Sequence, residues 1–250
     1  MSDPYHEAQL NARRTLSLIS PVKALNTPKV RIGGPRDGGY VMLDRLDGVS
    51  ICYSLGVGPD VSWDRSMADR GASIFQYDHT VEAAPDSHER FRFFRTGIAA
   101  DDSEAPMLKR IDTIIRENGH RDQRGMILKI DIEGHEWDSL DAVDSAVLDR
   151  FTQIVAEFHG MRLLTEESFL RRAHRLFTKL AATHRVVHAH GNNYGGWGNV
   201  AGIPVPDVLE LTFANRRDFD FGPSDEIFPT HLDQACNADC PDLYLGNFQF

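Results

Sequence analysis

The stretch Leu128-Lys129-Ile130-Asp131-Ile132-Glu133-Gly134-His135-Glu136 decides the fold that we expect for the rest of the chain. Its first half is an apolar run of β-type residues, and its second half places acids and a histidine around a glycine. Ligands of open parallel sheets bind outside the carboxyl ends of the strands, so Asp131, Glu133 and His135 should lie where chemistry takes place. The acids could instead cap a helix N-terminus, and for Glu136 this structural role is favoured.

Short β-type runs alternate with helix-compatible segments along the chain. Such alternation predicts right-handed βαβ units and a mostly parallel sheet with helices on both faces. A glycine-rich segment, 191–198, cannot form the last crossover helix, so the last strand should be antiparallel. We therefore predict a Rossmann-like α/β fold with a seven-stranded sheet. The predicted strands are 51–55, 73–77, 91–98, 126–131, 152–158, 185–190 and 208–213, and the main helices are 7–19, 61–70, 105–117, 137–143 and 166–182.

Composition and charge disfavour several classes of partner. The 250 residues include 37 acids and 27 bases, which gives a formal net charge of −10, and no dense basic run occurs. We therefore expect neither nucleic acid nor an anionic membrane as a partner. The N-terminal residues lack the features of a signal peptide, and three cysteines are too few for a disulfide framework, so we expect a cytoplasmic protein.

The length fits a single domain over residues 1–250. We expect a helical extension at residues 1–28 and an irregular, aromatic tail at residues 216–250. These two segments could pack against a second copy in a homodimer, or on their own domain.

Another glycine-rich segment, 33–39, lies between the β-type runs 29–32 and 40–43. Glycines permit positive φ angles and close backbone approach. The segment is therefore either a plain hairpin turn or a loop that closes over a ligand, and the sequence leaves both open.

The turn after the first main strand indicates a nucleoside cofactor. Gly56-Val57-Gly58 follows the strand, and Asp78 ends the next strand about 20 residues later, where an acid can accept hydrogen bonds from ribose hydroxyls. Val61 stands where a pyrophosphate-binding loop has its third glycine, Pro59 lacks an N–H, and Asp60 repels phosphate. A cofactor without phosphates, S-adenosylmethionine, fits this turn better than a dinucleotide.

Several motifs resemble those of the FkbM-type methyltransferases, which belong to the class I S-adenosylmethionine-dependent group and methylate hydroxyls of sugars, polyketides and related metabolites. The resemblance covers about residues 30–215 and is most specific at residues 128–136. It implies that Ser54, Gly56 and Gly58 lie at the methionine moiety, Asp78 at the ribose, and the segment from Ala99 to Asp101 at the adenine. The motifs are 54–58, 77–78, 97–102 and 128–136.

Methyl transfer to a hydroxyl needs a group that removes or polarises its proton. Asp131, Glu133 and His135 follow the fourth strand and His159 follows the fifth, so all four are candidate catalytic residues. A histidine considered singly is more often a structural residue. Three successive strands that end in carboxylates and histidines favour a catalytic site.

A divalent metal offers a second way to activate the hydroxyl. Asp131, Glu157 and His159 could hold Mg²⁺ and thereby lower the pKa of the reacting hydroxyl. After the sixth strand, His190, Asn192 and Tyr194 could contact a small-molecule or oligosaccharide acceptor.

The leading hypothesis is an S-adenosylmethionine-dependent O-methyltransferase that acts on a saccharide or a similar small metabolite. An NAD(P)-dependent oxidoreductase on a similar sheet is the alternative within enzymes. A non-catalytic interaction module, which would retain no cofactor, is the alternative outside them.

Overall fold

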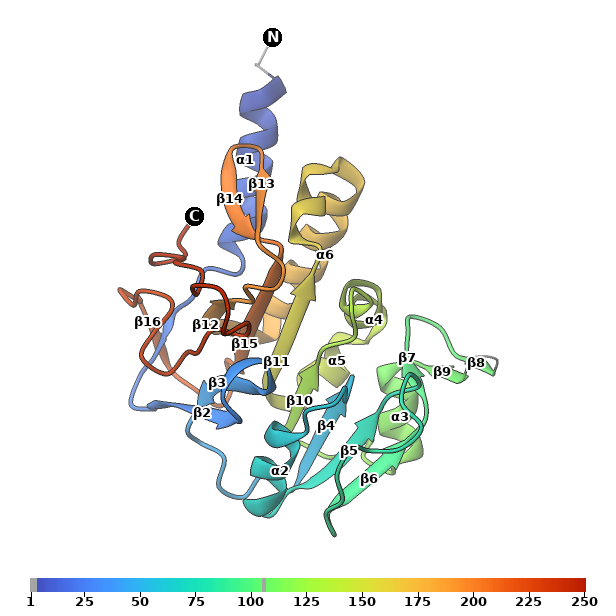
Figure 1. Cartoon of the computed structure of the whole chain (residues 1–250). Coiled ribbons are helices and arrows are strands. Elements are labelled where there is room, and N and C mark those ends of the chain that lie inside the picture. The colour runs from blue at the N-terminus through green and yellow to red at the C-terminus, as the bar shows by residue number, and fades with distance from the viewer. Residues whose placement is uncertain (1–3, 105–106) are drawn as a thin grey trace.

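The computed structural model describes residues 4–104 and 107–250, and a seven-stranded sheet forms its centre (Figure 1). The strand order is β12-β15-β11-β10-β4-β5-β6. β15 is antiparallel to both of its neighbours, and the remaining neighbours pair in parallel. This topology confirms the predicted Rossmann-like α/β fold with its antiparallel last strand. The strands are β12 (His184–Gly191), β15 (Val208–Asn215), β11 (Phe151–His159), β10 (Met126–Ile130), β4 (Ile51–Leu55), β5 (Ser73–Tyr77) and β6 (Phe91–Phe94).

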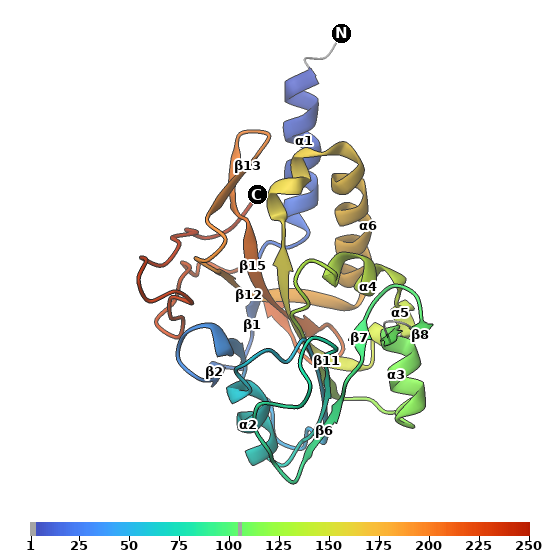
Figure 2. The same ribbon diagram turned by 45° about the vertical axis from the view of Figure 1, so that its right-hand side comes forward.

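Both faces of the sheet are covered, as predicted, because alternate strand residues point to opposite sides. Five helices pack on one face: α1 (Pro4–Ser17), α3 (Ile111–Glu117), α4 (Glu136–Ala142), α5 (Ser145–Leu148) and α6 (Glu167–Thr183). The other face is covered by α2 (Ser62–Asp69) and a hairpin of β2 (Lys29–Gly33) and β3 (Gly39–Leu43). Figure 2 shows the two layers on opposite sides of the sheet.

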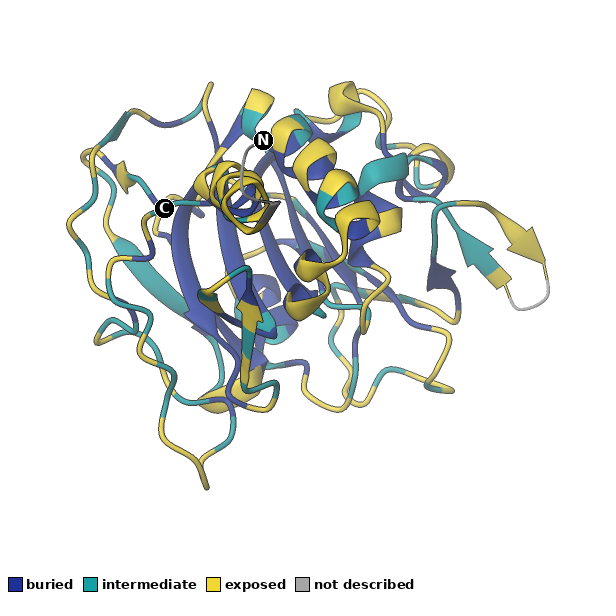
Figure 3. Cartoon of the chain, turned by 90° about the horizontal axis from the view of Figure 1, so that it is seen from above, coloured by how far each residue is buried: buried dark blue, intermediate teal, exposed yellow. Residues whose placement is uncertain are grey.

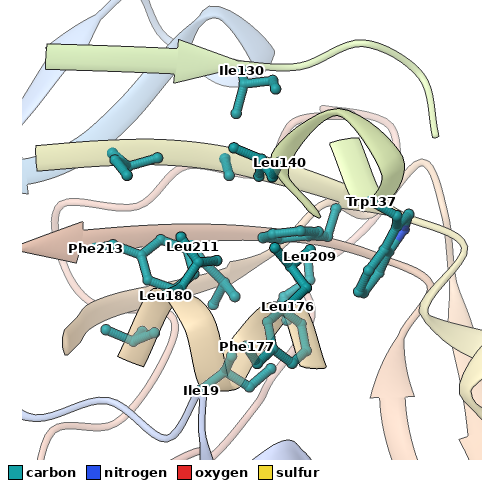
Figure 4. Packing of buried hydrophobic residues seen from close by; sticks show 14 of the residues in the cluster. Ile19, Ile130, Trp137, Leu140, Leu176, Phe177, Leu180, Leu209, Leu211 and Phe213 are labelled. Carbon is teal, nitrogen blue, oxygen red and sulfur yellow. The ribbon is translucent and has the colours of Figure 1, made fainter. Parts of the chain in front are cut away.

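Apolar side chains fill the space between the sheet and the larger helical layer. The Trp137 ring of α4 lies 4.8 Å from the Phe158 ring and 5.4 Å from the Phe177 ring, measured between centroids. Figure 4 shows Trp137 of α4 and Phe177 of α6 on the same side of β15, next to Leu209. Seen from above, the strands are buried and the outer helix surfaces are exposed (Figure 3). This packing fixes α4, and therefore the segment between β10 and α4.

The strand order reverses between β4 and β10, because α2 follows β4 on one face and α4 follows β10 on the other. Crossovers that diverge in this way leave a crevice at the carboxyl ends of the two strands. The N–H of Asp131 donates to the carbonyl of Leu55 at 2.9 Å, so the two strand ends are tied together at this point. Ligands of such sheets bind here.

Two predicted elements are wrong in extent. The third strand was expected over 91–98, but β6 ends at Phe94, and β7 (Gly97–Ile98) joins a separate small sheet with β8 (Ser103–Glu104) and β9 (Met107–Lys109). The helix expected over 105–117 begins only at Ile111, and residues 105–106 lie outside the described residues. The Asp102 carboxylate accepts from the Arg110 N–H at 2.7 Å and from the Thr113 hydroxyl at 2.9 Å, which fixes this later start.

The remaining elements are short. The glycine-rich segment after β12 leads into a hairpin of β13 (Trp197–Val200) and β14 (Ile203–Pro206), and β1 (Lys23–Ala24) pairs with β16 (Phe221–Gly222) in the tail. Two 3-10 turns, η1 (Arg36–Gly38) and η2 (Met161–Thr165), complete the elements. Among the described residues, no helix has both the length and the apolar character needed to cross a bilayer.

Candidate active site

A cavity of about 470 Å³ opens at the carboxyl ends of β4, β5 and β10. We call it the strand-end cavity. It lies at the point where the strand order reverses, which is where the sheet topology places a ligand. Its walls come from the turn after β4, the ends of β5 and β10, the small sheet at β7 and the β2–β3 hairpin. The lining residues include Asp37, Gly38, Tyr40, Gly56, Val57, Gly58, Tyr77, Asp78, His79, Gly97, Ile98, Lys129, Asp131, Glu133 and His135.

The turn after β4 requires glycine. Gly56 has a φ of 79°, and a Cβ on it would lie 1.6 Å from the carbonyl oxygen of Asp131. Any side chain would therefore push the turn away from the end of β10. Gly58 also has a positive φ, 58°, but a Cβ there would meet no atom within 4 Å. Gly56 is thus the residue that lets the two strand ends approach.

Asp78 holds this turn from the end of β5. Its Oδ2 accepts hydrogen bonds from the N–H groups of Val57, at 3.0 Å, and Gly58, at 3.2 Å. Its Oδ1 accepts from the backbone N–H of Thr80 at 2.7 Å. Burial alone would raise the pKa of Asp78, but these hydrogen bonds outweigh it, so the pKa lies below its usual value. Asp78 is therefore an ionised carboxylate at the cavity wall.

The segment after β10 is built around the buried carboxylate of Glu136. One oxygen accepts from the Ile132 N–H at 2.8 Å, and the other accepts from the Gly134 N–H at 3.0 Å. The same carboxylate lies 3.2 Å from Nδ1 of His159. These contacts show the structural role that the sequence favoured for Glu136. Its carboxylate shapes the turn and orients His159, which belongs to the next strand.

Asp131, Glu133 and His159 come together at the rim of the cavity. Their candidate ligand atoms all lie within 4.8 Å of one another, and Nε2 of His159 also lies 3.5 Å from Glu157. Burial alone would lower the pKa of His159, but its bond to Glu136 and the charges of Glu136, Asp131 and Glu133 raise the pKa above its usual value. The ring therefore favours the protonated state, as a counter-charge to these acids.

Tyr40 of β3 links two of these carboxylates. Its hydroxyl lies 3.3 Å from an oxygen of Asp131 and 3.5 Å from an oxygen of Glu157. Nζ of Lys129 lies 5.6 Å from the centre of the Tyr40 ring, donates to the Gly56 carbonyl at 2.9 Å and approaches Asp131 to 3.8 Å. One ammonium thus connects the turn after β4 with the acid that follows β10.

A second acid cluster adjoins the first. Oxygens of Asp37, Glu157 and Glu210 lie within 4.8 Å of one another. The side-chain N–H₂ of Asn192 donates to Asp37 and to Glu157, at 2.9 Å in each case. Burial and the charges of Asp131, Glu210 and Asp37 raise the pKa of Glu157 well above its usual value. Burial and the charges of Glu210 and Asp131 likewise raise the pKa of Asp37.

The Methyltransferase FkbM domain matches residues 35–194, which is more than half of the chain. The chain belongs to the FkbM methyltransferase family. The match begins after β2 and includes β3, the turn after β4 and the segment after β10. All residues that line the strand-end cavity therefore lie within the family domain.

More distant similarities exist among solved structures. A candidate methyltransferase from an antibiotic biosynthesis pathway of Anabaena variabilis ATCC 29413 has 12% identity and a TM-score of 0.30 over 56% of this chain, and the chain spans 57% of its length. A candidate hemolysin of Streptococcus thermophilus has 11% identity and a TM-score of 0.36, with 84% of this chain and 83% of that one covered. No protein of curated function shows a significant match.

Several site residues predicted for this FkbM methyltransferase do line the cavity: Gly56, Gly58, Asp78, Asp131, Glu133 and His135. Others do not. Ser54 is fully buried beneath the turn, Asp101 is exposed, and the cavity is lined by Gly97 and Ile98 rather than by Ala99. His159 and Glu157 lie directly behind Asp131 and Glu133.

The three residues that were expected to contact an acceptor, His190, Asn192 and Tyr194, lie in different surroundings. Asn192 reaches the acid cluster, whereas Tyr194 is 65% exposed. His190 is buried between Glu210, at 2.8 Å, and Asp242 of the tail, at 3.0 Å. His190 therefore supports Glu210 and does not face the cavity wall.

Sequence reasoning missed Tyr40 and Lys129 as parts of the site, and it left open the role of the segment that contains Asp37. A signal existed for Lys129, because a lone cation in an otherwise apolar buried strand needs a compensating partner. The glycine-rich segment 33–39 combines the two alternatives that the sequence left open. It connects the two strands of a hairpin, and its residues Asp37 and Gly38 line the cavity. The contacts of Tyr40 connect residues 91 and 117 positions apart, which no local pattern reveals.

Proposed function

We propose that the protein is an S-adenosylmethionine-dependent O-methyltransferase that acts on a hydroxyl of a saccharide or a similar small metabolite. One observation carries the proposal. A single cavity joins the Gly56–Gly58 turn and Asp78 on one side to Asp131 on the other. A donor-binding turn and a group able to take a proton therefore face the same space, which methyl transfer requires.

The residues on the donor side fit a nucleoside cofactor. The cavity of about 470 Å³ lies in the size range of cofactor sites. Because Gly56 has no side chain, the turn lies against the end of β10, and its backbone forms part of the cavity wall. Asp78 is ionised, and its oxygens accept four hydrogen bonds, from the N–H groups of Val57, Gly58 and Thr80 and from the Thr80 hydroxyl. A ribose hydroxyl would bind Asp78 in place of the Thr80 hydroxyl, which can rotate away.

When bound, S-adenosylmethionine supplies a methyl group that is already activated for displacement. We assign the removal of the acceptor proton to Asp131, which lines the cavity at the end of β10. The Tyr40 hydroxyl and the Lys129 ammonium orient its carboxylate. Glu136 orients the His159 ring, and this histidine supplies positive charge behind the reacting group.

Mg²⁺ is the second means of activation that these residues would support. Asp131, Glu133 and His159 offer two oxygens and a nitrogen within 4.8 Å, and Glu157 lies next to His159. A cation held there would polarise an acceptor hydroxyl.

For the acceptor, exposed aromatic rings beside Asn192 favour a ring-shaped polar molecule. Tyr194 and Trp197 are 65% and 49% exposed. Aromatic faces of this kind can stack on a sugar ring, whose axial C–H groups form an apolar patch.

Calorimetric titration of S-adenosylmethionine, S-adenosylhomocysteine and NAD, each with and without Mg²⁺, tests the proposal. We expect both adenosyl ligands to bind at micromolar strength and Asp78→Ala to abolish their binding. Asp122→Asn, a change at an exposed acid that precedes β10, at the end of this strand opposite to the cavity, serves as the control.

Binding of NAD without binding of the adenosyl ligands would instead support an oxidoreductase. Binding of none of the three by folded protein would support a non-catalytic module.

A further inference from the structure

We infer that the acceptor of this methyltransferase carries a protonated amine near its reacting hydroxyl, as an amino sugar or an amino alcohol does. The inference rests on the proposed function, because it concerns the acceptor side of the same cavity. The cavity, the sheet topology and the family match support the location of the site. The charged residues around the cavity support the class of acceptor that we infer.

Carboxylates dominate the acceptor side. Asp37 and Asp131 both line the cavity, one from the β2–β3 hairpin and the other from the end of β10. Glu157 and Glu210 lie behind Asp37, with oxygens of all three within 4.8 Å. Asp37 and Asp131 are also close enough for the charge of Asp131 to raise the pKa of Asp37. A ligand between these two residues therefore meets negative charge from two directions.

Three cationic or potentially cationic side chains near this space already have partners. Within residues 4–104 and 107–250, Lys129 is the one Lys or Arg that lines the cavity, and it binds the Gly56 carbonyl and faces Asp131. His190 is held between Glu210 and Asp242. His159 is bonded to the buried Glu136. Asp37 has an amide partner, Asn192, but no cation among these groups.

The orientation of Asn192 indicates an ammonium rather than a metal ion at Asp37. The Tyr194 N–H donates to Oδ1 of Asn192 at 3.0 Å, which turns the side-chain N–H₂ toward Asp37 and Glu157. A metal ion between these carboxylates would face N–H hydrogens, which cannot coordinate it. An ammonium, by contrast, donates to the lone pairs of Asp37 and Asp131 that remain free.

The same charges disfavour anionic acceptors. A phosphate or carboxylate group in this space would lie against Asp37 and Asp131. Lys129, the one Lys or Arg that lines the cavity among the described residues, is already engaged by Gly56 and Asp131. Like charges repel, and water screens this repulsion less beside partly buried groups than in bulk solvent. Uronic acids and sugar phosphates should therefore be poor ligands.

Two matched sets of probes test the inference by calorimetry on protein saturated with S-adenosylhomocysteine. The first set is glucosamine, glucose and glucuronate, and the second is 3-amino-1,2-propanediol, glycerol and glycerate. We expect the amine of at least one set to bind at least tenfold more tightly than its neutral partner, and the anion to bind least. Asp37→Asn should remove most of this preference, and Asp122→Asn should leave it unchanged.

The outcomes separate the two proposals. If S-adenosylhomocysteine does not bind, the proposed function fails. If it binds but neither amine binds more tightly than its neutral partner, the charge inference alone is wrong. A third arm repeats the titrations with EDTA and with added Mg²⁺. Glucose or glycerol could bind tightly only with Mg²⁺, and the amines could then bind no more tightly than these neutral probes. In that case a metal ion, and not an ammonium group, neutralises the carboxylates, and the inference is overturned.

Discussion

At the scale of single residues, Gly56 has the most restrictive environment in the site. Its Cα faces the carbonyl of Asp131, so the contact between the turn after β4 and the end of β10 depends on the absence of a side chain. Gly58 shares the positive φ but not the close contact. The two glycines of one motif therefore have different physical tasks.

We predict that Gly56→Ala abolishes binding of S-adenosylhomocysteine, because the turn must move away from Asp131 to make room for the methyl group. Gly58→Ala should keep measurable binding and lose only about 1 kcal/mol of stability, the usual penalty for a left-handed alanine. Calorimetry and thermal unfolding of both variants measure the difference. Equal effects of the two changes would contradict this account of the turn.

Glu136 carries a second residue-scale prediction. Glu136→Gln replaces one of two accepting oxygens by an N–H₂ group, which then faces the N–H of Ile132 or Gly134. Leaving a buried donor unpaired should cost about 1–3 kcal/mol of unfolding free energy, measured in urea. Glu133→Gln, at a residue whose side chain is 86% exposed, is the matched control and should change stability by less than about 0.5 kcal/mol.

At the scale of elements, the β2–β3 hairpin completes the site although it lies outside the seven-stranded sheet. Gln153 of β11 binds both backbone groups of Leu43, at 2.8 and 3.0 Å, and the Thr212 hydroxyl of β15 donates to the Val41 carbonyl at 2.6 Å. Ser62 of α2 accepts from the Gly34 N–H at 2.7 Å. These contacts fix the hairpin on the sheet and thereby place Asp37 and Tyr40 at the cavity.

β12 begins with a buried histidine that makes stability depend on pH. Burial lowers the pKa of His184 to about 4, and its Nε2 lies 3.0 Å from the Phe151 carbonyl. The unfolded chain has a pKa near 6.5 at this residue and gains a proton first as the pH falls. The contribution of neutral His184 is therefore complete above about pH 6.5 and decreases toward pH 4, by roughly 3 kcal/mol in total.

We predict that His184→Gln makes the unfolding free energy less dependent on pH over this window. Urea unfolding of the wild type and the variant at pH 7 and pH 4.5 provides the comparison. His6→Gln, at an exposed position in α1, should reproduce the wild-type slope. If both variants keep that slope, His184 is not the group that titrates.

At the scale of the whole molecule, the tail packs against the end of β12 and the segment that follows it. Nδ2 of Asn193 lies within hydrogen-bond distance of the carbonyls of Asn237, Cys240 and Pro241, at 2.9 to 3.2 Å, and Asp242 binds His190. The tail is thus held by the segment that also carries Asn192. Its position determines the surroundings of Glu210.

We predict that Asn193→Ala releases the tail, because three carbonyls lose their donor, and that limited proteolysis then cuts near residues 237–241 at least several times faster. Binding of S-adenosylhomocysteine should be retained, since the donor side lies across the cavity. Asn11→Ala, at an exposed residue of α1, is the control. An unchanged cleavage rate would contradict this role of Asn193.

Most of the sheet could be predicted from local patterns. β4 and β5 begin and end at the predicted residues, and the other main strands differ by only a few residues at their ends. The prediction failed where short strands and a proline interrupt the pattern around residues 95–110, because pairing there depends on contacts between separate segments. For the site, strand ends were predictable, and Gly56, Asp78 and Asp131 do line one cavity.

The sequence by itself determined the alternation of strands and helices with an antiparallel last strand, the glycine turn and the acids at the strand ends, because these follow from local patterns and from the handedness of βαβ units. Only the tertiary structure decided which side chains surround the acids. Tyr40, Asp37 and Asn192 reach Asp131 and Glu157 from a hairpin and a loop distant in sequence. Their positions depend on how the hairpin and the loop pack on the sheet. No local sequence pattern determines such packing.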